Sequence, residues 1–382
     1  MTARLLLSCG ETSGDLYAGA LTRELRAQNP GLTIAGLGGP QFAAAGGRLI
    51  EDYRGLAVTG VTEVIGTLSR LAATRRRLVE YARDDRVDAF IAIDYSGFNL
   101  RLAQSIKRLG IPVVFYISPQ VWAWRAGRLK TIRATAERML VIFPFEEAIY
   151  REAGVPVTFV GHPLIDLLPR VESREEFLSR LGLDASARTV AVLPGSRTSE
   201  LRRILPDLVA ACRLVARRLP GTQFIVARAP NLDDGLFAPA LGKDVPLAIV
   251  EGQTDTVLAA ADLALTASGT ATVQTALHGT PMVVVYRLSG LEYAIGRRFV
   301  KVDTFAMVNL IAGSRVVPEL IQDAFTPEAV ADEAVLLLTD TGRAEAMRQN
   351  LATVRARLGG PGASRRAAEA ISRLLQQRKE QA

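Results

Sequence analysis

The sequence predicts an α/β protein with two Rossmann-like domains that face a cleft, followed by a helical C-terminus. Short apolar runs alternate with segments of helical periodicity along most of the 382 residues, which is typical of parallel sheets covered by helices. The alternation stops once, at residues 161–174, where two prolines fall, and then resumes. The turns richest in Gly and Ser follow expected strands, at the sheet edge where such folds bind ligands.

The apolar runs mark the expected strands of each series. In the first series these are residues 4–9, 32–37, 89–93, 113–117, 139–143 and 157–160. The expected helices between them are 16–28, a short one after residue 40, 61–83, 99–109 and 145–153. In the second series the expected strands are 189–193, 223–227, 247–250, 263–266 and 282–286, with helices at 200–219 and 271–278 and from residue 327 almost to the end. We therefore expect domains at 1–165 and 166–345, and helices at 346–382 that return to the first domain.

Composition bounds the function. An apolar content of 49% with 22% charged residues is ordinary for a core-forming protein. The net charge of +7 favours anionic partners such as nucleotides, phosphorylated sugars or an acidic membrane surface. Aromatic residues are only 6% of the chain and do not alternate with basic ones, which argues against nucleic acid.

The two cysteines, Cys9 and Cys212, lie far apart in apolar segments, as expected of reduced thiols in a cytosolic protein. Neither they nor His162 and His278 form a group that predicts a metal site, and no cofactor is expected. The chain enters a strand almost at once, so we expect no signal peptide. No apolar run reaches the ~18–20 residues that span a bilayer, so any membrane contact is expected to be peripheral.

Two turns of the second series suit an anion. Ser268, Gly269 and Thr270 follow a strand and open a helix, where backbone N–H groups can face a phosphate. Ser196 and Arg197 follow another strand, and the planar guanidinium suits phosphate. The alternatives are close packing of small residues at the first turn and a capped helix with a solvated arginine at the second.

Three polar residues end strands of the first series. Asp94 stands between an apolar strand and a glycine turn, where its carboxylate could act as a general base. Glu11 and Ser13 lie at the equivalent end of the first strand and suit recognition of a sugar or phosphate. Helix capping is the alternative for all three. The spacing around Gly10 is not that of a dinucleotide-binding loop.

Two further candidates lie in loops. Trp122, beside Trp124, could line an acceptor pocket, and the alternative is a packed loop. His162, at a strand end on the expected linker, could touch a ligand or serve as a structural residue.

The helix expected at 61–83 carries an apolar stripe next to arginines. This combination is typical of a helix that binds in the plane of an anionic membrane surface. The alternative, which the residues alone favour, is a core-facing helix with a solvated basic end. The residues concerned are Val64, Ile65, Leu68, Leu71, Arg75, Arg76 and Arg77.

Taken together, these stretches resemble the lipid-A-disaccharide synthases over nearly the full chain. The matching stretches are 10–15, 38–40, 118–124, 160–163, 193–197, 268–272, 281–286 and 309–313. The resemblance implies a GT-B fold and an inverting transfer that requires no metal. The implied donor is UDP-2,3-diacylglucosamine, the implied acceptor is 2,3-diacylglucosamine 1-phosphate (lipid X), and the implied products are a β(1→6) disaccharide 1-phosphate and UDP. It also favours the membrane interpretation, at the inner face of the cytoplasmic membrane.

The resemblance assigns roles to residues. Asp94 matches the family's general base, Glu11 and Ser13 its essential polar pair, and Asn309 a catalytically important amide. Ser196, Arg197, Ser268, Gly269 and Thr270 match the nucleotide-binding side. The sequence departs from the family in two places: Gln274 stands where a glutamate usually holds the ribose hydroxyls, and 95–97 lack the usual proline and second aspartate.

Two other functions stay open at this point. One is another GT-B enzyme acting on UDP-GlcNAc, either an epimerase or a glucosaminyltransferase. The other is a non-enzymatic binder of anionic lipid, which Gln274 supports. Whether the chain forms a homodimer is not decided by the sequence.

Overall fold

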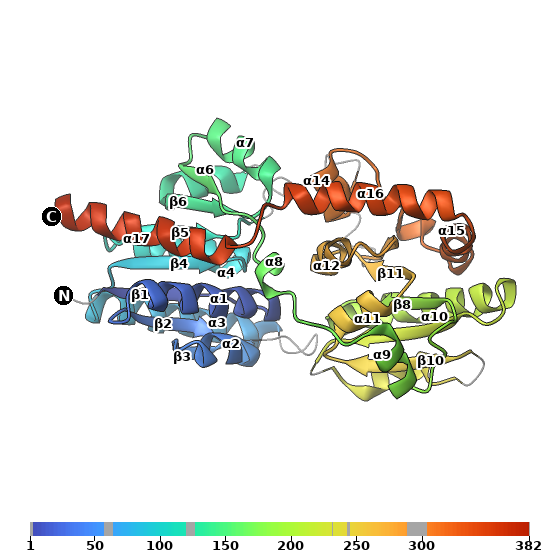
Figure 1. Ribbon diagram of the computed structural model, residues 1–382. Helices are drawn as coiled ribbons and strands as arrows, with labels where there is room; N and C mark the ends of the chain where they lie inside the picture. The colour runs from blue at the N-terminus through green and yellow to red at the C-terminus, as the bar shows by residue number, and fades with distance from the viewer. Residues whose placement is uncertain are drawn as a thin grey trace. The chain divides into compact units, whose positions relative to one another are not determined.

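The computed structural model describes residues 3–56, 64–119, 127–230, 232–242, 245–288 and 304–381. The chain divides into two compact units: Met1–Leu167 with Leu358–Ala382, and Leu168–Arg357 (Figure 1). Each unit contains one sheet whose strands are all parallel. The predicted α/β class with two parallel-sheet domains is therefore confirmed.

The first unit holds a seven-stranded sheet in the order β3-β2-β1-β4-β5-β6-β7. Its strands are β1 (Arg4–Ser8), β2 (Thr33–Gly38), β3 (Arg48–Asp52), β4 (Ala89–Ile93), β5 (Val113–Tyr116), β6 (Ala136–Val141) and β7 (Val157–Phe159). The central strands β1 and β4 are almost fully buried, because helices cover both faces of the sheet. Only β3 was not predicted, since its sequence RLIED has just two consecutive apolar residues.

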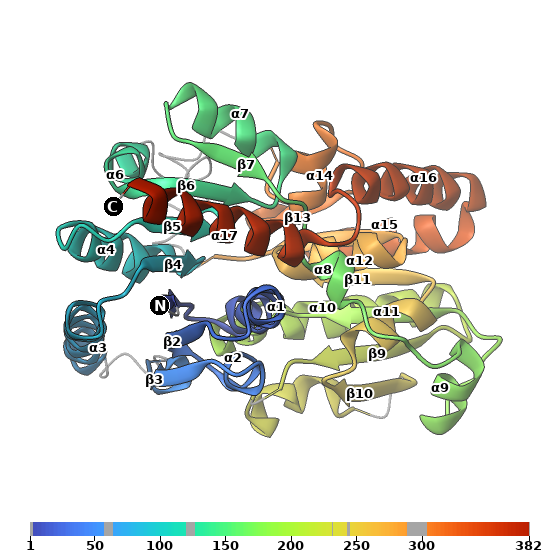
Figure 2. The ribbon, with the colours of Figure 1, turned by 60° about the vertical axis from the view of Figure 1, so that its left-hand side comes forward.

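Helices cover the two faces of this sheet in two groups, as right-handed crossovers require. On one face α1 packs against α2 and α17, and on the other α3 packs against α4, which packs against α6 (Figure 2). The helices of the unit are α1 (Thr12–Gln28), α2 (Pro40–Ala44), α3 (Val64–Asp84), α4 (Ser96–Lys107), α6 (Gly127–Thr135), α7 (Pro144–Glu152), α8 (Leu164–Leu167) and α17 (Ala363–Gln381), with a 3₁₀ turn η1 (Tyr53–Leu56).

The second unit holds a six-stranded sheet in the order β10-β9-β8-β11-β12-β13. Its strands are β8 (Thr189–Leu193), β9 (Gln223–Arg228), β10 (Leu247–Glu251), β11 (Leu263–Ala267), β12 (Met282–Tyr286) and β13 (Glu319–Ile321). Its helices are α9 (Arg174–Arg180), α10 (Thr198–Arg218), α11 (Thr254–Ala260), α12 (Thr270–His278), α14 (Met307–Ala312), α15 (Pro327–Thr339) and α16 (Thr341–Arg357), with 3₁₀ turns η3 (Asp234–Ala240) and η4 (Gln322–Ala324). The sequence did not predict the short edge strand β13.

The C-terminal helices are shared between the units. α16 packs against α12 and α14 of the second unit, whereas α17 packs against α1 of the first. The division therefore falls at Leu358, twelve residues after the boundary at 346 that we expected. The carboxylate of Asp166 accepts hydrogen bonds from the backbone N–H groups of Gly362 (2.6 Å) and Ala363 (2.8 Å), which fixes the start of α17 on the first unit.

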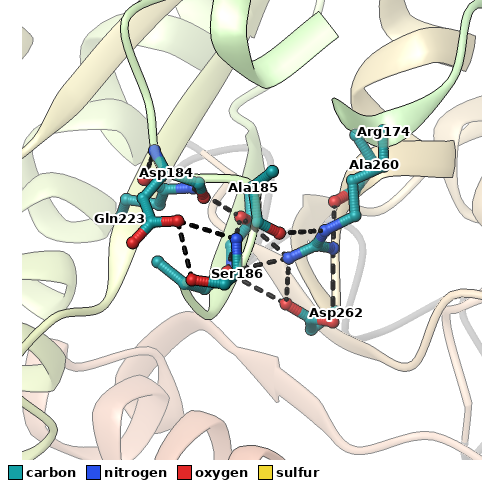
Figure 3. Close-up of polar contacts among 9 residues, drawn as sticks. Arg174, Asp184, Ala185, Ser186, Gln223, Ala260 and Asp262 are labelled. Carbon is teal, nitrogen blue, oxygen red and sulfur yellow. Dashed lines mark hydrogen bonds and ion pairs between the residues drawn. The ribbon is translucent and has the colours of Figure 1, made fainter. Parts of the chain in front are cut away.

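A polar network ties together the amino ends of the strands in the second unit (Figure 3). The guanidinium of Arg174 donates to both carboxylate oxygens of Asp262 (3.0 and 3.3 Å) and to the carbonyl of Ala187 (2.8 Å). Asp262 also accepts from the backbone N–H of Thr189 (2.8 Å). Because Asp262 precedes β11 and Thr189 begins β8, the network sets the stagger of the two strands whose far ends carry the Ser268 and Ser196 turns.

We predict that Arg174→Met lowers the free energy of unfolding by about 1–3 kcal/mol, because it leaves Asp262 and several carbonyl groups without their donor. Urea denaturation measures the loss. The control is Arg180→Met on the same helix, whose ion pair with Glu172 is partly exposed and should contribute less than about 1 kcal/mol. Equal losses in the two variants would contradict the structural role of Arg174.

Candidate active site

The carboxyl ends of β1 and β4 carry the first group of candidate residues. β1 and β4 are neighbours in the sheet, so Glu11 and Ser13, which follow β1, come to the same edge as Asp94, which follows β4. All three side chains are half-buried. The structure therefore brings together the three residues of the first unit that the sequence singled out for catalysis.

An unusual backbone turn presents Asp94. Asp94 and Tyr95 both have positive φ angles, +44° and +47°, a left-handed conformation that residues other than glycine adopt at a cost. The ring of Tyr95 lies on Gly10, where a Cβ atom would come within 2.2 Å of it. Burial raises the pKa of Tyr95, and the nearby charge of Glu11 adds to the rise. The turn after β4 is thus packed directly onto the turn after β1.

The buried amide of Asn99 locks these two turns together. Its Nδ2 atom donates to the carbonyls of Asp94 (2.8 Å), Ser8 (3.1 Å) and Ile93 (3.1 Å). Its Oδ1 atom accepts from the hydroxyl of Ser8 (2.7 Å). Sequence reasoning assigned Asn99 no role, although an asparagine early in a helix after a strand is a signal for such a clamp.

Two further polar residues shape this edge of the sheet. The buried carboxylate of Asp15 accepts from the backbone N–H groups of Gly39 (2.8 Å), Gln41 (2.9 Å) and Phe42 (3.0 Å), which caps α2. Arg128 on α6 donates to the hydroxyl of Ser96 (3.1 Å), directly after Tyr95. Asp15 thus has a structural role. Arg128 places a cation beside the turn that carries Asp94, and sequence reasoning missed this arginine.

His162 lies inside the first unit. Its ring is 6.1 Å from that of Tyr17 and 5.4 Å from that of Phe143, measured between ring centroids. Its Nδ1 atom accepts from the backbone N–H of Leu164 (3.2 Å). Burial lowers the pKa of His162 to about 3, so the ring is neutral at physiological pH. The histidine therefore shapes the end of β7 from within the core.

In the second unit, β8 and β11 are neighbours, so the turns that follow them share one edge of the sheet. Glu200 organises the turn after β8, because its carboxylate accepts from the backbone N–H groups of Ser196 (3.1 Å) and Arg197 (3.3 Å) and from the Arg197 guanidinium (3.1 Å). Gly195 has a φ of +117°, and a Cβ atom there would come within 2.5 Å of Glu200. Glu200 therefore fixes the loop after β8, and sequence reasoning missed it. The Arg197 side chain remains about half exposed to solvent.

The turn after β11 is open to solvent. Gly269 and Thr270 are exposed, Ser268 and Gln274 are half-buried, and α12 begins at Thr270. The Ser268 hydroxyl donates to the carbonyl of Phe305 (3.2 Å). Since the first N–H groups of a helix have no partner within the helix, this exposed N-terminus keeps the geometry of an anion site.

Asn309 lies next to this turn, in the interior. Its Nδ2 atom donates to Glu319 (2.5 Å) and to the carbonyl of Val317 (3.0 Å), and its Oδ1 atom accepts from the N–H groups of Val316 (2.7 Å) and Val317 (3.0 Å). These four bonds use the full capacity of an amide. Glu319 also accepts from the N–H groups of Phe305 and Ala306 at the start of α14. Asn309 and Glu319 therefore fix the start of α14, and the carbonyl of Phe305 there accepts the Ser268 hydroxyl.

The helix α3 carries the residues assigned to the membrane. Leu68 is 57% exposed, and Leu71 and Arg75 are half-buried. Arg76 and Arg77 are exposed and pair with Glu80 (3.7 Å) and Glu51 (2.7 Å). Trp122 and the side chains of Val64 and Ile65 lie outside the described residues.

Two searches of the described residues bear on metals and membranes. In the parts of the chain that the structure describes, no three His, Cys, Asp or Glu side chains gather so as to hold a metal ion. Among the described helices, none combines the length and hydropathy that crossing a bilayer requires.

The fold is that of GT-B glycosyltransferases and sugar-nucleotide epimerases. UDP-GlcNAc 2-epimerase from Neisseria meningitidis superposes with a TM-score of 0.71 at 12% identity, over 98% of this chain and 100% of that one. MurG of Acinetobacter baumannii gives 0.57 at 15% identity, over 98% and 100%. At such identities the likeness shows the fold alone.

Sequence comparison defines the family. The family model of lipid-A-disaccharide synthetase matches residues 5–373. The lipid-A-disaccharide synthase of Myxococcus xanthus is 44% identical over 373 residues, covering 97% of both chains. That of Syntrophus aciditrophicus is 44% identical over 366 residues, covering 95% of this chain and 96% of its own. The chain belongs to the lipid-A-disaccharide synthase family of glycosyltransferases.

We predict that Asn99→Ala loses both stability and activity. Removing the amide leaves the Ser8, Ile93 and Asp94 carbonyls without their shared donor, which should cost about 1–3 kcal/mol and release the Asp94 turn. Urea denaturation and kcat measure the two effects. Ser105→Ala is the control and should change neither, because within the described part of the chain this half-buried residue of α4 bonds only the carbonyl of Arg101 on its own helix (3.3 Å) and not the Asp94 turn. An Asn99→Ala protein with normal kcat would show that the clamp does not position Asp94.

Proposed function

We propose that this chain transfers 2,3-diacylglucosamine from UDP-2,3-diacylglucosamine to the 6-hydroxyl of 2,3-diacylglucosamine 1-phosphate, with inversion. Family membership supports the pair of substrates. The observation that carries the assignment of roles is the locked turn after β4, which presents one carboxylate, Asp94, at the sheet edge beside Glu11 and Ser13.

In this proposal Asp94 is the general base that takes the proton from the attacking hydroxyl. The Asn99 amide bonds the Asp94 backbone carbonyl and so holds in place the turn that carries the proposed base. Glu11 and Ser13 orient the acceptor sugar through hydrogen bonds. The packing of Tyr95 on Gly10 fixes the spacing between these groups, which favours a reactive alignment of the acceptor.

The second unit would hold the UDP moiety. The α12 N-terminus with Ser268, Gly269 and Thr270 would bind the diphosphate. As UDP leaves, the Arg197 guanidinium would neutralise part of its charge and the Ser196 hydroxyl would donate a hydrogen bond to it. Gln274, one turn into α12, would reach the ribose hydroxyls. The proposed task of Asn309 is to hold this surface in place through Glu319, rather than to contact substrate.

We predict that Asp94→Asn lowers kcat/KM by about 10²–10⁴-fold, the usual contribution of a general base. The assay follows acceptor-dependent UDP release in detergent with EDTA present, and mass spectrometry identifies the disaccharide. Calorimetric UDP binding should be unchanged, because the proposed UDP site belongs to the other unit. Near-normal turnover by Asp94→Asn would rule out the base role.

We also propose that α3 makes a peripheral contact with an anionic membrane, at the inner face of the cytoplasmic membrane. The exposed Leu68 and the basic stretch from Arg75 to Arg77 support this. Leu68→Gln should weaken co-sedimentation with phosphatidylglycerol vesicles several-fold without changing the melting temperature, because the side chain is exposed. Leu109→Gln, an exposed leucine after α4, is the control. Equal vesicle binding by all three proteins would contradict the contact.

A further inference from the structure

A groove of about 330 Å³ lies between α3 and the start of α4, within the first unit. Leu68, Leu71 and Ala72 line it from α3, Gly97 and Phe98 line it from α4, and Tyr95 lines it from the turn before α4. The volume is at the lower end of the ~300–1,000 Å³ typical of small-molecule sites. One of its lining residues, Tyr95, directly follows the proposed base Asp94, so the groove lies next to the proposed acceptor site.

Two arginines flank this apolar lining. Arg75 from α3 and Arg101 from α4 both border the groove. Neither forms an ion pair with another residue in the described ranges, in contrast to Arg76 and Arg77 on the same helix. An apolar channel with two uncompensated cations suits a ligand that has both an alkyl chain and an anionic group.

We infer that the α3–α4 groove binds one acyl chain of the acceptor, and that Arg75 and Arg101 bind the acceptor's phosphate. The inference rests on the proposed function, since it assigns the acceptor to the Asp94 side of the first unit. The acceptor combines acyl chains with a phosphate, whereas the donor's diphosphate is assigned to the second unit. The groove therefore selects the acceptor by alkyl length and charge together.

Gly97 allows a direct test of the acyl site. Among the residues that the structure describes, a Cβ atom on Gly97 would meet nothing within 4 Å, and the φ of Gly97 is not positive. Gly97→Leu should therefore fold and project its side chain into the groove. Leucine also has the higher helix propensity. Gly360→Leu is the matched control, because Gly360 is likewise exposed, has open space and lies outside the groove.

The experiment measures calorimetric binding of 2,3-diacylglucosamine 1-phosphates of increasing acyl length, all below their micelle concentrations. Wild type and Gly360→Leu should gain up to about fourfold in affinity per added methylene, the value for a fully buried methylene, until the groove is filled. In Gly97→Leu this gain should disappear while the shortest ligand binds normally. An unchanged length dependence in Gly97→Leu, or none in wild type, would overturn the acyl site.

The phosphate contact is tested with the double variant Arg75→Gln/Arg101→Gln. It should bind the 1-phosphate ligand about tenfold more weakly and the dephosphorylated ligand normally, with Arg83→Gln on α3 as control. Equal weakening for both ligands would overturn the phosphate assignment. Turnover of the wild-type protein is measured separately, so absent transfer with intact, length-dependent binding would reject the proposed reaction and leave the groove supported.

Discussion

The hydrogen bonds of the Asn99 amide hold the turns after β1 and β4 in one fixed arrangement, and the candidate site of the first unit depends on them. Two neighbouring strands end in buried surroundings, where backbone carbonyls need partners that water does not supply. One side chain serves the Ser8, Ile93 and Asp94 carbonyls at once. Because these bonds offset the left-handed conformation of Asp94, the fold can keep a carboxylate at the sheet edge.

The same device recurs elsewhere in the chain. Asp15 caps α2, and the Glu200 carboxylate accepts hydrogen bonds from N–H groups of the loop after β8. The Asn309–Glu319 pair fixes the start of α14. In each case a polar side chain holds a loop near a strand's carboxyl end, and the groups proposed to meet the substrate are its neighbours. Polar residues in the matching motifs thus fall into two sets, those that shape the turns and those that face the ligand.

The sequence predicted the buried strands well because their apolar runs are continuous, as in β4 and β8. It missed β3 and β13 because each offers only two consecutive apolar residues, too short a run to indicate a strand. It singled out Asp94, Glu11 and the Ser268 turn as candidates from their places after strands. It could not show that all four hydrogen bonds of the Asn309 amide would go to neighbouring backbone groups and Glu319. Nor could it show that His162 would pack against Tyr17 and Phe143. These depend on contacts between residues distant in sequence or on loop shape, which no local pattern encodes.

The central claim is that the first unit binds the acceptor and the second unit binds UDP. A crystal structure with UDP and the 1-phosphate acceptor tests this claim most directly. We predict UDP on the α12 N-terminus of the second unit. We also predict the acceptor 6-hydroxyl about 2.6–3.2 Å from the Asp94 carboxylate, the reach of a general base. UDP bound at the Glu11 turn, or an acceptor hydroxyl facing a group other than Asp94, would contradict the account.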